Sequence, residues 1–501
     1  MKKLFNWMMI ATVAAVLMTA CTEEETPNNS VAISGVPATA VVEAGQSVAP
    51  VTATITAADG LSTLVVRKDG ATVETINFNG EVTANHEFTY QTTAEDADKN
   101  LVFEFVATDK NGDTQTSTYV LTVGEIASVI KIENNITADE EWETGKVYVL
   151  SGRIAVTAGV TLKINPGVIV KGEAGSGSNA TALVIARGAK IEAVGTADQP
   201  IIFTSIADEI APGMVASPNL DPDIDGLWGG LLVLGKAPGS FAGDVTEVQI
   251  EGIPPSDSNG LYGGDDPEDY SGIIKYVSIR HGGANIGEGN EINGLTLGGV
   301  GSQTIIENVE VIANQDDGIE WFGGTVSVKN ALIWNSGDDA LDTDQAWAGT
   351  LDNFIVITGS ATDHALEIDG PEGAYNAGHT VQNGTIVGND VSELGDFRDG
   401  ARGTFKNILF KSFADPATTD GRGDLSLSGD KSLENFENSI LAFENLEIVI
   451  AEGVSLSSVF KHGTSAHAST VADDASTVGA DKAAFSDWTW AAEAGKLTDL
   501  K

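Results

Sequence analysis

The sequence predicts an all-β protein whose larger part is a parallel β-helix. One observation is a repeat: asparagines at positions 308, 330 and 353 are 22 and 23 residues apart, and a similar apolar segment follows each. The other is composition, because the repeating stretch is rich in glycine and β-branched residues and almost free of helix formers. A repeat of this length and composition is typical of one coil of a β-helix. The asparagine recurs at 383 and 407, and we expect it to stack inside a turn as an amide ladder.

Stacking brings equivalent residues of successive coils together, about 4.8 Å apart. Alternate residues of the second strand in each repeat are apolar, and we expect them to point into the coil. The residues between them along the same strand are mostly acidic, and we expect these to point outward. The inward columns hold Ile319, Leu341 and Leu366, then Trp321, Thr343 and Ile368. The outward columns hold Glu320, Asp342, Glu367 and Asp396, then Phe322, Asp344, Asp369 and Arg398.

An outward stack of carboxylates requires compensation. Two carboxylates about 4.8 Å apart repel by roughly 3 kcal/mol at an effective dielectric constant near 20. A bound cation, a proton retained on one member, or the guanidinium of Arg398 would each relieve this repulsion, and each describes a functional site. The alternative is that the side chains spread into water, where salt screens their charges.

The N-terminus has the pattern of an export signal. In residues 1–21, two lysines precede an apolar run that ends near Met18. The only cysteine, Cys21, stands where the signal ends; this resembles the cleavage box of bacterial lipoproteins and implies a lipid on Cys21. Residues 22–30 are predicted to be a flexible tether, whose acidic start resembles the tag that brings Bacteroidota lipoproteins to the outer face of the outer membrane. The alternatives are an ordinary signal peptide with a chance cysteine and a plain linker.

The charge of the chain restricts its partners. The formal net charge is −45, so nucleic acids and anionic membrane surfaces are poor partners, whereas calcium is a good one. No segment after the signal reaches the roughly 20 apolar residues of a membrane span, so we expect the lipid to be the only membrane attachment. A single cysteine leaves no disulfide within the chain.

Residues 31–124 contain alternating strand patterns separated by turn signals such as Asp59-Gly60 and Asn79-Gly80. This spacing predicts a small antiparallel β-sandwich. The turn at residues 107–112 resembles that of bacterial immunoglobulin-like repeats, which implies an immunoglobulin-like domain. Its sequence contains no catalytic grouping, and we expect it to be a spacer.

From about residue 126 the chain becomes rich in valine, isoleucine and glycine. Residues 159–168, 182–193 and 200–205 resemble the entry coils of right-handed parallel β-helix proteins of the pectin-lyase-like superfamily. The resemblance implies that residues 126–501 form a right-handed parallel β-helix with a C-terminal cap. It implies no single function, because this fold is shared by lyases, hydrolases, adhesins and non-catalytic binders.

A segment rich in glycine, proline and aspartate interrupts the coils between about residues 206 and 272. Within it, Asp221, Asp223 and Asp225 alternate as in the first half of a calcium loop, and we expect calcium there. The closing glutamate of such a loop is absent, since Leu232 stands at that position. The alternative is a solvated acidic loop.

The tail, residues 481–500, contains Phe485, Trp488 and Trp490. We expect it to form a short helix over the open end of the last coil, where an exposed strand edge would invite association.

Three turns on consecutive coils resemble the catalytic motifs of polygalacturonases. They are residues 314–318, 336–339 and 363–365. In that family three aspartates protonate the glycosidic oxygen and activate a water; the resemblance implies that these are Asp317, Asp338 and Asp339. It also implies that His364 supports the acid. Such chemistry needs one carboxyl group with a raised pKa and one that is ionised. The glycines around the family's histidine are absent, as is its basic substrate-binding segment, which Arg398 replaces only by analogy.

Three functions remain open. The first is a surface-exposed lipoprotein that binds or processes polysaccharide through the acidic columns, with calcium and exposed aromatic rings assisting. The second is a polygalacturonase-like inverting glycoside hydrolase. The third is a structural or adhesive surface protein with no small ligand. The aromatic residues expected to stack on sugar rings are Trp334, Trp347 and Phe322.

Overall fold

The computed structural model describes residues 31–93, 96–97, 99–126, 129–175, 179–284, 292–419, 422–498 and 500. The predicted signal peptide, Cys21 and the tether lie outside these residues. The chain forms two compact units. Residues 31–42, 48–90 and 99–123 belong to the first, and residues 43–47, most of 91–97 and the residues described after 124 belong to the second.

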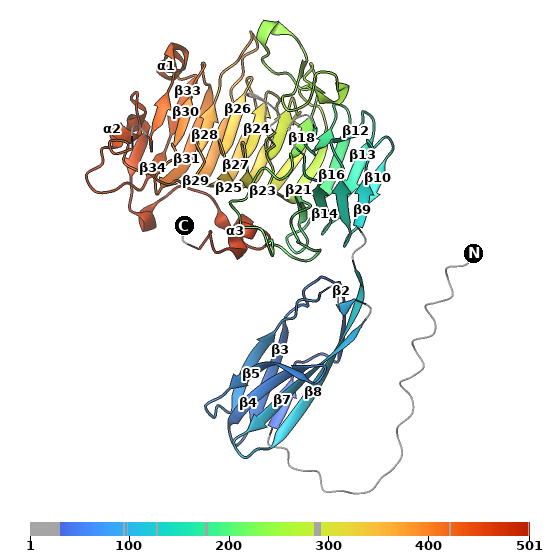
Figure 1. Ribbon diagram of the computed structural model, residues 1–501. Coiled ribbons are helices and arrows are strands. Elements are labelled where there is room, and N and C mark those ends of the chain that lie inside the picture. The colour runs from blue at the N-terminus through green and yellow to red at the C-terminus, as the bar shows by residue number, and fades with distance from the viewer. Residues whose placement is uncertain are drawn as a thin grey trace. The chain divides into compact units, whose positions relative to one another are not determined.

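The first unit is a β-sandwich. Its strands are β1 (Val31–Ser34), β2 (Thr39–Ala44), β3 (Val51–Ala57), β4 (Leu61–Lys68), β5 (Ala71–Asn77), β6 (Thr83–Phe88), β7 (Asn100–Asp109) and β8 (Thr114–Ile126). One antiparallel sheet has the order β1-β3-β6 and the other β2-β8-β7-β4-β5 (Figure 1). Phe88 of the first sheet packs on Phe103 and Phe105 of the second, so aromatic side chains fill the core between them. The predicted sandwich is confirmed.

The second unit is a parallel β-helix built on two long sheets (Figure 1). The longer sheet follows the path β9 (Val129–Ile132), β11 (Val147–Leu150), β14 (Ile169–Gly172), β17 (Ile201–Ser205), β21 (Gly272–Arg280), β23 (Ile305–Asn314), β25 (Val328–Ser336), β27 (Thr350–Ile357), β29 (Thr380–Val387), β31 (Gly403–Lys411), β34 (Leu446–Ile448) and β35 (Ala468–Thr470). Joined to it off this path are β10 (Glu140–Trp142), β13 (Thr161–Ile164), β16 (Lys190–Val194) and β33 (Leu441–Glu444). The second sheet contains β12 (Ile154–Val156), β15 (Leu183–Ile185), β18 (Leu231–Leu234), β22 (Leu295–Gly298), β24 (Ile319–Phe322), β26 (Leu341–Asp344), β28 (Leu366–Ile368), β30 (Gly395–Phe397) and β32 (Leu425–Leu427).

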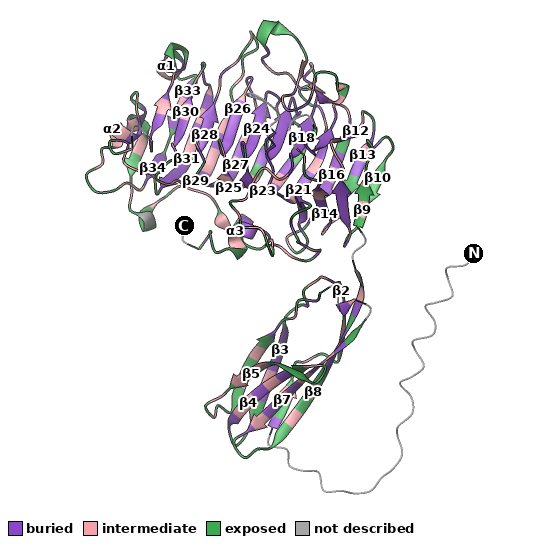
Figure 2. Ribbon diagram, in the orientation of Figure 1, coloured by how far each residue is buried: buried purple, intermediate pink, exposed green. Residues whose placement is uncertain are grey.

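The strand register confirms the predicted columns. Asp342 pairs with Glu320 on one side and with Glu367 on the other, and Glu367 pairs with Asp396. The alternate residues of the same strands belong to the apolar core of the coil, and Figure 2 shows that most of the coil's strands are buried. The sequence period therefore placed the acidic side chains correctly in line.

Asparagine side chains form the predicted ladder. Asn330 Nδ2 donates to Asn308 Oδ1 at 2.7 Å, and Asn353 donates to Asn330 at 2.7 Å. The predicted asparagines have φ values between 57° and 62°, in the left-handed region that asparagine tolerates better than most residues. The ladder is interrupted at Asn383, whose side-chain amide donates to Asp352. It ends at Asn445, an asparagine that the repeat in the sequence did not predict.

The predicted interruption between 206 and 272 is wrong in part, because β18 returns to the second sheet inside it and pairs with β15 and β22. The remainder forms a short hairpin of β19 (Val248–Gln249) and β20 (Leu261–Tyr262) with the 3-10 helices η3 (Ala242–Asp244) and η4 (Ser258–Gly260). Tyr262 contacts both Phe241 and Phe322, with ring centroids 5.5 and 6.1 Å away. The outer face of β24 is therefore covered at its end.

The C-terminal tail packs along the side of the long sheet rather than over the open end of the coil. Its apolar residues Phe485, Trp488 and Trp490 join Leu332 and Trp334 of β25 in one cluster. Large aromatic side chains are stabilised by burial against other apolar side chains, and β25 presents Leu332 and Trp334 to them. The helical segments that follow β32 in the chain are α1 (Asp430–Glu437), α2 (Leu456–Val459), η5 (Thr464–His467), η6 (Asp473–Ala475), η7 (Lys482–Phe485) and α3 (Trp490–Glu493). In the described residues no helix is both long and apolar enough to cross a bilayer.

A buried ion pair fastens this tail. Arg280 and Glu310 are both fully buried, and an Arg280 guanidinium nitrogen lies 3.6 Å from Glu310 Oε2. Glu310 also accepts the backbone N–H groups of Trp490 at 3.2 Å and Ala491 at 3.0 Å. The Arg280 guanidinium lies 5.0 Å from the centre of the Trp490 ring. One charged pair thus connects two coils to the C-terminal segment.

Candidate functional site

Three turn residues form a row just before β24, β26 and β28. Asp317 Oδ1 accepts the backbone N–H of Asp339 at 2.9 Å, and Asp339 Oδ1 accepts that of His364 at 2.8 Å. Asp317 is 6% exposed and Asp339 is 3% exposed. Each aspartate satisfies a backbone donor of the next coil, and this contact fixes the row.

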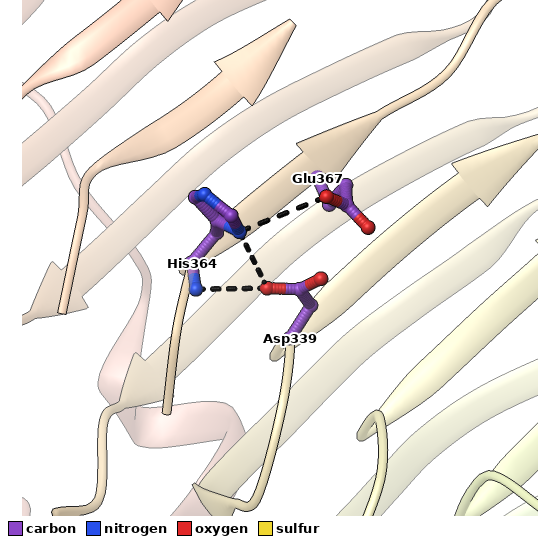
Figure 3. Close-up of side chains that lie close together, drawn as sticks. All are labelled: Asp339, His364 and Glu367. Atoms are coloured by element: carbon purple, nitrogen blue, oxygen red, sulfur yellow. Dashed lines mark hydrogen bonds and ion pairs between the residues drawn. The ribbon is translucent and has the colours of Figure 1, made fainter. Parts of the chain in front are cut away.

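His364 connects Asp339 to Glu367 (Figure 3). Its Nδ1 donates to Asp339 Oδ1 at 2.8 Å and lies 3.7 Å from Glu367 Oε1. Burial alone lowers the pKa of His364, but the hydrogen bond and the charge of Asp339 outweigh burial and raise it to about 9. Burial alone raises the pKa of Asp339, but the hydrogen bond and charge of His364 leave it below the ordinary value. Asp339 is therefore ionised, and His364 is its charged partner.

Glu367 differs from Asp339 although both carboxyl groups face His364. Burial and the negative charge of Asp339 raise the pKa of Glu367 to about 9, against the opposing charges of Arg398 and His364. At neutral pH the contact between Asp339 and Glu367 therefore joins an ionised carboxylate to a neutral carboxylic acid.

A second acidic group, the Asp342 trio, contains Asp317, Glu320 and Asp342. One carboxyl oxygen from each lies within 4.8 Å of the others, and all three residues are buried. Burial, followed by the negative charges of neighbouring carboxyl groups, raises all three pKa values well above their ordinary range. The side-chain NH₂ group of Asn293 donates to Glu320. The side-chain oxygen of Asn293 accepts the backbone N–H of Asp317 at 3.3 Å. Asp342 Oδ1 is buried without a hydrogen-bond partner.

Two arginines lie along the acidic columns, and each contacts two acidic side chains. Arg398 pairs with Glu367, and its Nε lies 3.0 Å from Asp369 Oδ1. Arg422 pairs with Asp363 and lies 3.2 Å from Glu393.

Asp344 is the member of the second acidic column that precedes Asp369. Burial and the negative charge of Asp369 raise the pKa of Asp344 to about 8.

An open groove of about 670 Å³ lies beside the row of turn residues. Asp338, which is exposed, and Asp363 line it, and they directly precede Asp339 and His364 in the chain. Its other lining residues are Ser360, Ala361, Thr362, Asp390, Val391, Thr419 and Arg422. A chain-shaped polar ligand in this groove would pass next to Asp339.

The alternative expectation, that the stacked carboxyl groups spread into water, is wrong for three members of the first acidic column. Glu320, Asp342 and Glu367 are only 6–7% exposed. Neighbouring loops reach them, and Glu251 of the interrupting segment is close enough for its charge to help raise the pKa of Glu320. Spreading into water is therefore not how these carboxyl groups avoid repulsion.

The aromatic residues expected to stack on sugar rings are also buried, which corrects that prediction. Trp347 stacks on Trp321 inside the coil with ring centroids 4.6 Å apart. Trp334 lies under the C-terminal tail, and Phe322 lies under the interrupting segment. None of Trp334, Trp347 and Phe322 presents a ring face to solvent.

The aspartates of the predicted calcium loop differ in exposure. Asp221 and Asp223 are exposed, while burial and the charge of Asp223 raise the pKa of Asp225. Across the ranges that the structure describes, the groups that bring three ligand atoms within 4.8 Å of one another all lie on the coil, and none includes these aspartates.

Sequence reasoning missed Asn293, Glu393 and Arg422. Asn293 lies before β22, outside the repeats that align by their asparagine, so no column pointed to it. Arg422 belongs to a loop, and only its rarity as a cation in an acidic chain could have drawn attention to it.

The buried carboxyl groups predict that the protein melts at lower temperature as the pH rises from about 5 to about 8. The pKa of Glu367 is about 9 in the folded chain against an ordinary 4.5, and that of Asp344 is about 8 against 3.8. A pKa raised by folding contributes stability that is complete below the ordinary value and is lost as pH rises toward the folded value. His364, raised from 6.5 to about 9, acts in the same direction above pH 6.5. Calorimetry across this range tests the trend, and Glu367→Gln should flatten it. A melting temperature that rises toward pH 8 would contradict the proposed protonation states.

The fold and the site together define a class of protein: a parallel β-helix that presents a row of buried carboxyl groups beside an open polar groove. The chain belongs to the family of pectate-lyase-like β-helix domains, whose model matches residues 134–493.

Comparisons with individual proteins give weaker likenesses. No curated protein matches the chain. Among solved structures, the catalytic unit of a thermostable GH87 α-1,3-glucanase from Streptomyces thermodiastaticus strain HF3-3 is 13% identical, with 83% of this chain and 73% of that chain covered and a TM-score of 0.30. The fibronectin(III)-like modules of Clostridium thermocellum CbhA are 15% identical, with 19% of this chain and 97% of that chain covered and a TM-score of 0.15. At these scores neither likeness identifies a function.

Proposed function

We propose that the protein cleaves a polysaccharide by general acid–base catalysis at Asp317 and Asp339. The observation that carries the proposal is the opposite perturbation of two neighbouring buried carboxyl groups. The pKa of Asp317 is well above its ordinary range because of burial, whereas that of Asp339 is lowered through His364. One acid that keeps its proton and one ionised base are what hydrolysis of a glycosidic bond requires.

The roles follow from these protonation states. Asp317 accepts a backbone N–H at Oδ1, which leaves its other oxygen to carry the proton for the glycosidic oxygen. Asp339 takes a proton from the attacking water, and His364 positions it by two contacts to the same oxygen. Asp338 lies at the groove wall, where it can bind sugar hydroxyl groups. The family to which the chain belongs, and a groove open along the coil, support a polymeric substrate.

Release of reducing ends by the wild-type protein from a panel of polysaccharides tests this proposal. We expect at least one polymer to be shortened, with a rate that is highest at mildly acidic to neutral pH, where Asp317 is protonated and Asp339 ionised. Absence of turnover across neutral, amino and acidic polymers would overturn it.

A non-catalytic glycan-binding protein is the second candidate. Asp317 and Asp339 each accept a backbone N–H of the next coil, which is also what a purely structural aspartate does. This candidate predicts saturable binding of a glycan that is never shortened.

The N-terminal pattern supports attachment of the protein to the cell surface by a lipid on Cys21. Replacing Cys21 with Ser should move the protein from the membrane fraction to the soluble fraction, because the lipid is the anchor. Immunoblots of the two fractions measure this, with Thr22→Ser as the matched control. Continued membrane association of the Cys21→Ser protein would contradict the lipid anchor.

A further inference from the structure

Glu393 continues the row of turn residues by one coil. It forms a parallel bridge with His364, and its backbone N–H donates to the carbonyl oxygen of Asp363 at 2.7 Å. His364 therefore lies between Asp339 of the preceding coil and Glu393 of the following coil. Equivalent residues of stacked coils are about 4.8 Å apart, so the side chains of both neighbours can reach the imidazole ring.

The two ring nitrogens of His364 face different carboxyl groups. Nδ1 donates to Asp339 Oδ1 at 2.8 Å, and Nε2 lies 3.8 Å from Glu393 Oε2, which is the distance of an ion pair and not of a hydrogen bond. A neutral imidazole has a proton on one nitrogen only, so its other nitrogen would turn a lone pair toward a carboxylate. The imidazolium has an N–H at both nitrogens. This arrangement therefore suits the charged form of His364.

Arg422 fixes the orientation of the Glu393 carboxyl group. Its Nη1 lies 3.2 Å from Glu393 Oε1, whereas Oε2 is the oxygen that faces His364. A carboxylate that meets one cation at each oxygen is held in a single orientation. Arg422 also contacts Asp363, the acidic residue that directly precedes His364 in the chain. Glu393 is thus held with Oε2 toward Nε2.

Other charged groups surround both residues. They are Asp339, Asp363 and Glu367 at His364, and Arg422, Asp396, Asp424 and Lys461 at Glu393. The pKa of Glu367 is about 9, so at neutral pH it brings little negative charge. Burial raises the pKa of Glu393, but the positive charge of His364 opposes the rise, and contact with two cations favours the ionised form. Glu393 therefore supplements the charge of Asp339 at the other ring nitrogen.

We propose that Glu393 is a further positioning residue of the site, which keeps the proton on Nε2 of His364 while Asp339 reacts. The proposal rests on the proposed function. In that reaction the water oxygen bonds to the sugar carbon and the bond to the glycosidic oxygen breaks. Asp317 gives its proton to that oxygen, and Asp339 takes a proton from the water and so loses its charge. Glu393 takes no part in these transfers, so its charge remains and His364 keeps both N–H groups.

The imidazole titration of His364, followed by nuclear magnetic resonance in the full-length chain, tests the inference. Loss of one signal in His364→Gln identifies this residue among the six histidines. We expect Glu393→Gln to lower the pKa of His364 from about 9 by roughly 1, the small end of the usual effect of a charge at this range. Glu393→Asp, which keeps the charge, should restore most of the loss. An unchanged pKa in Glu393→Gln, or equal falls in the two variants, would overturn the proposal.

Asp390→Asn is the matched control. Asp390 is exposed and lines the groove, so its substitution removes one negative charge that water and salt already screen. The pKa of His364 should stay at the wild-type value in this variant. A fall as large as that in Glu393→Gln would show that net charge, and not the contact at Nε2, holds the proton, and would overturn the inference. Circular dichroism confirms that each variant is folded, and Glu393→Ala takes the place of Glu393→Gln if the latter is not.

Failure of this inference is distinguishable from failure of the proposed function, because the titration needs no turnover. If the pKa of His364 falls as expected in Glu393→Gln but the wild-type protein shortens no polysaccharide, the catalytic proposal fails and the pairing of Glu393 with His364 stands. If polysaccharide is cleaved but the pKa of His364 does not change in Glu393→Gln, the catalytic proposal stands and Glu393 is not a positioning residue.

Discussion

Replacing Asp339 with Asn is expected to lower the rate of polysaccharide cleavage about a thousandfold. Asparagine keeps the shape of the side chain and an oxygen that can accept the His364 N–H, so the row of turn residues should remain in place. It cannot take a proton from water, and loss of a positioned general base typically costs a factor of about 10² to 10⁴. The turnover number measured from released reducing ends is the readout, with Asp223→Asn on the exposed loop as the matched control.

The same substitution also removes the charge that holds the proton on His364. Without Asp339 the pKa of His364 should fall from about 9 toward or below its ordinary 6.5, because burial is then weakly opposed. The imidazole titration measured by nuclear magnetic resonance reports this shift. Full activity of the variant would show that Asp339 is not the base. A His364 that still titrates near 9 would show that Asp339 is not its partner.

Replacing Glu310 with Gln is expected to lower the free energy of unfolding by about 3–5 kcal/mol, the usual cost of removing one member of a buried ion pair. Arg280 would remain fully buried without its ion-pair partner, and the N–H groups of Trp490 and Ala491 would share a weaker acceptor. The C-terminal tail should separate from the long sheet before the coil unfolds, because Glu310 fastens it directly. Urea denaturation and limited proteolysis of residues 481–500 measure the two effects.

An exposed ion pair provides the matched control for Glu310. Lys431 and Glu434 lie 3.1 Å apart and are each 60% exposed, so Glu434→Gln should change the free energy of unfolding by less than about 1 kcal/mol. Equal effects of the two substitutions would contradict the view that burial sets the cost.

The repeat of the sequence was sufficient to predict the coil and the alignment of its columns. Glu320, Asp342 and Glu367 are in register because parallel pairing of strands fixes which residues are neighbours once the repeat is known. The asparagine ladder was predictable for the same reason. The contacts of Asn293 and Arg422 were not, since neither residue belongs to the repeat that made the columns visible.

What the sequence determined by itself was therefore the order of the two folds, the stacking of the coils and the line of carboxyl groups along one sheet. Only the tertiary structure decided which of those groups are buried, which keep their protons and which side chains cover them. The tail and the segment around Tyr262 enclose Trp334 and Phe322, although both segments lie far away in the chain. Periodicity specifies the register between neighbouring strands, whereas burial and pKa depend on the distant loops that cover the same surface.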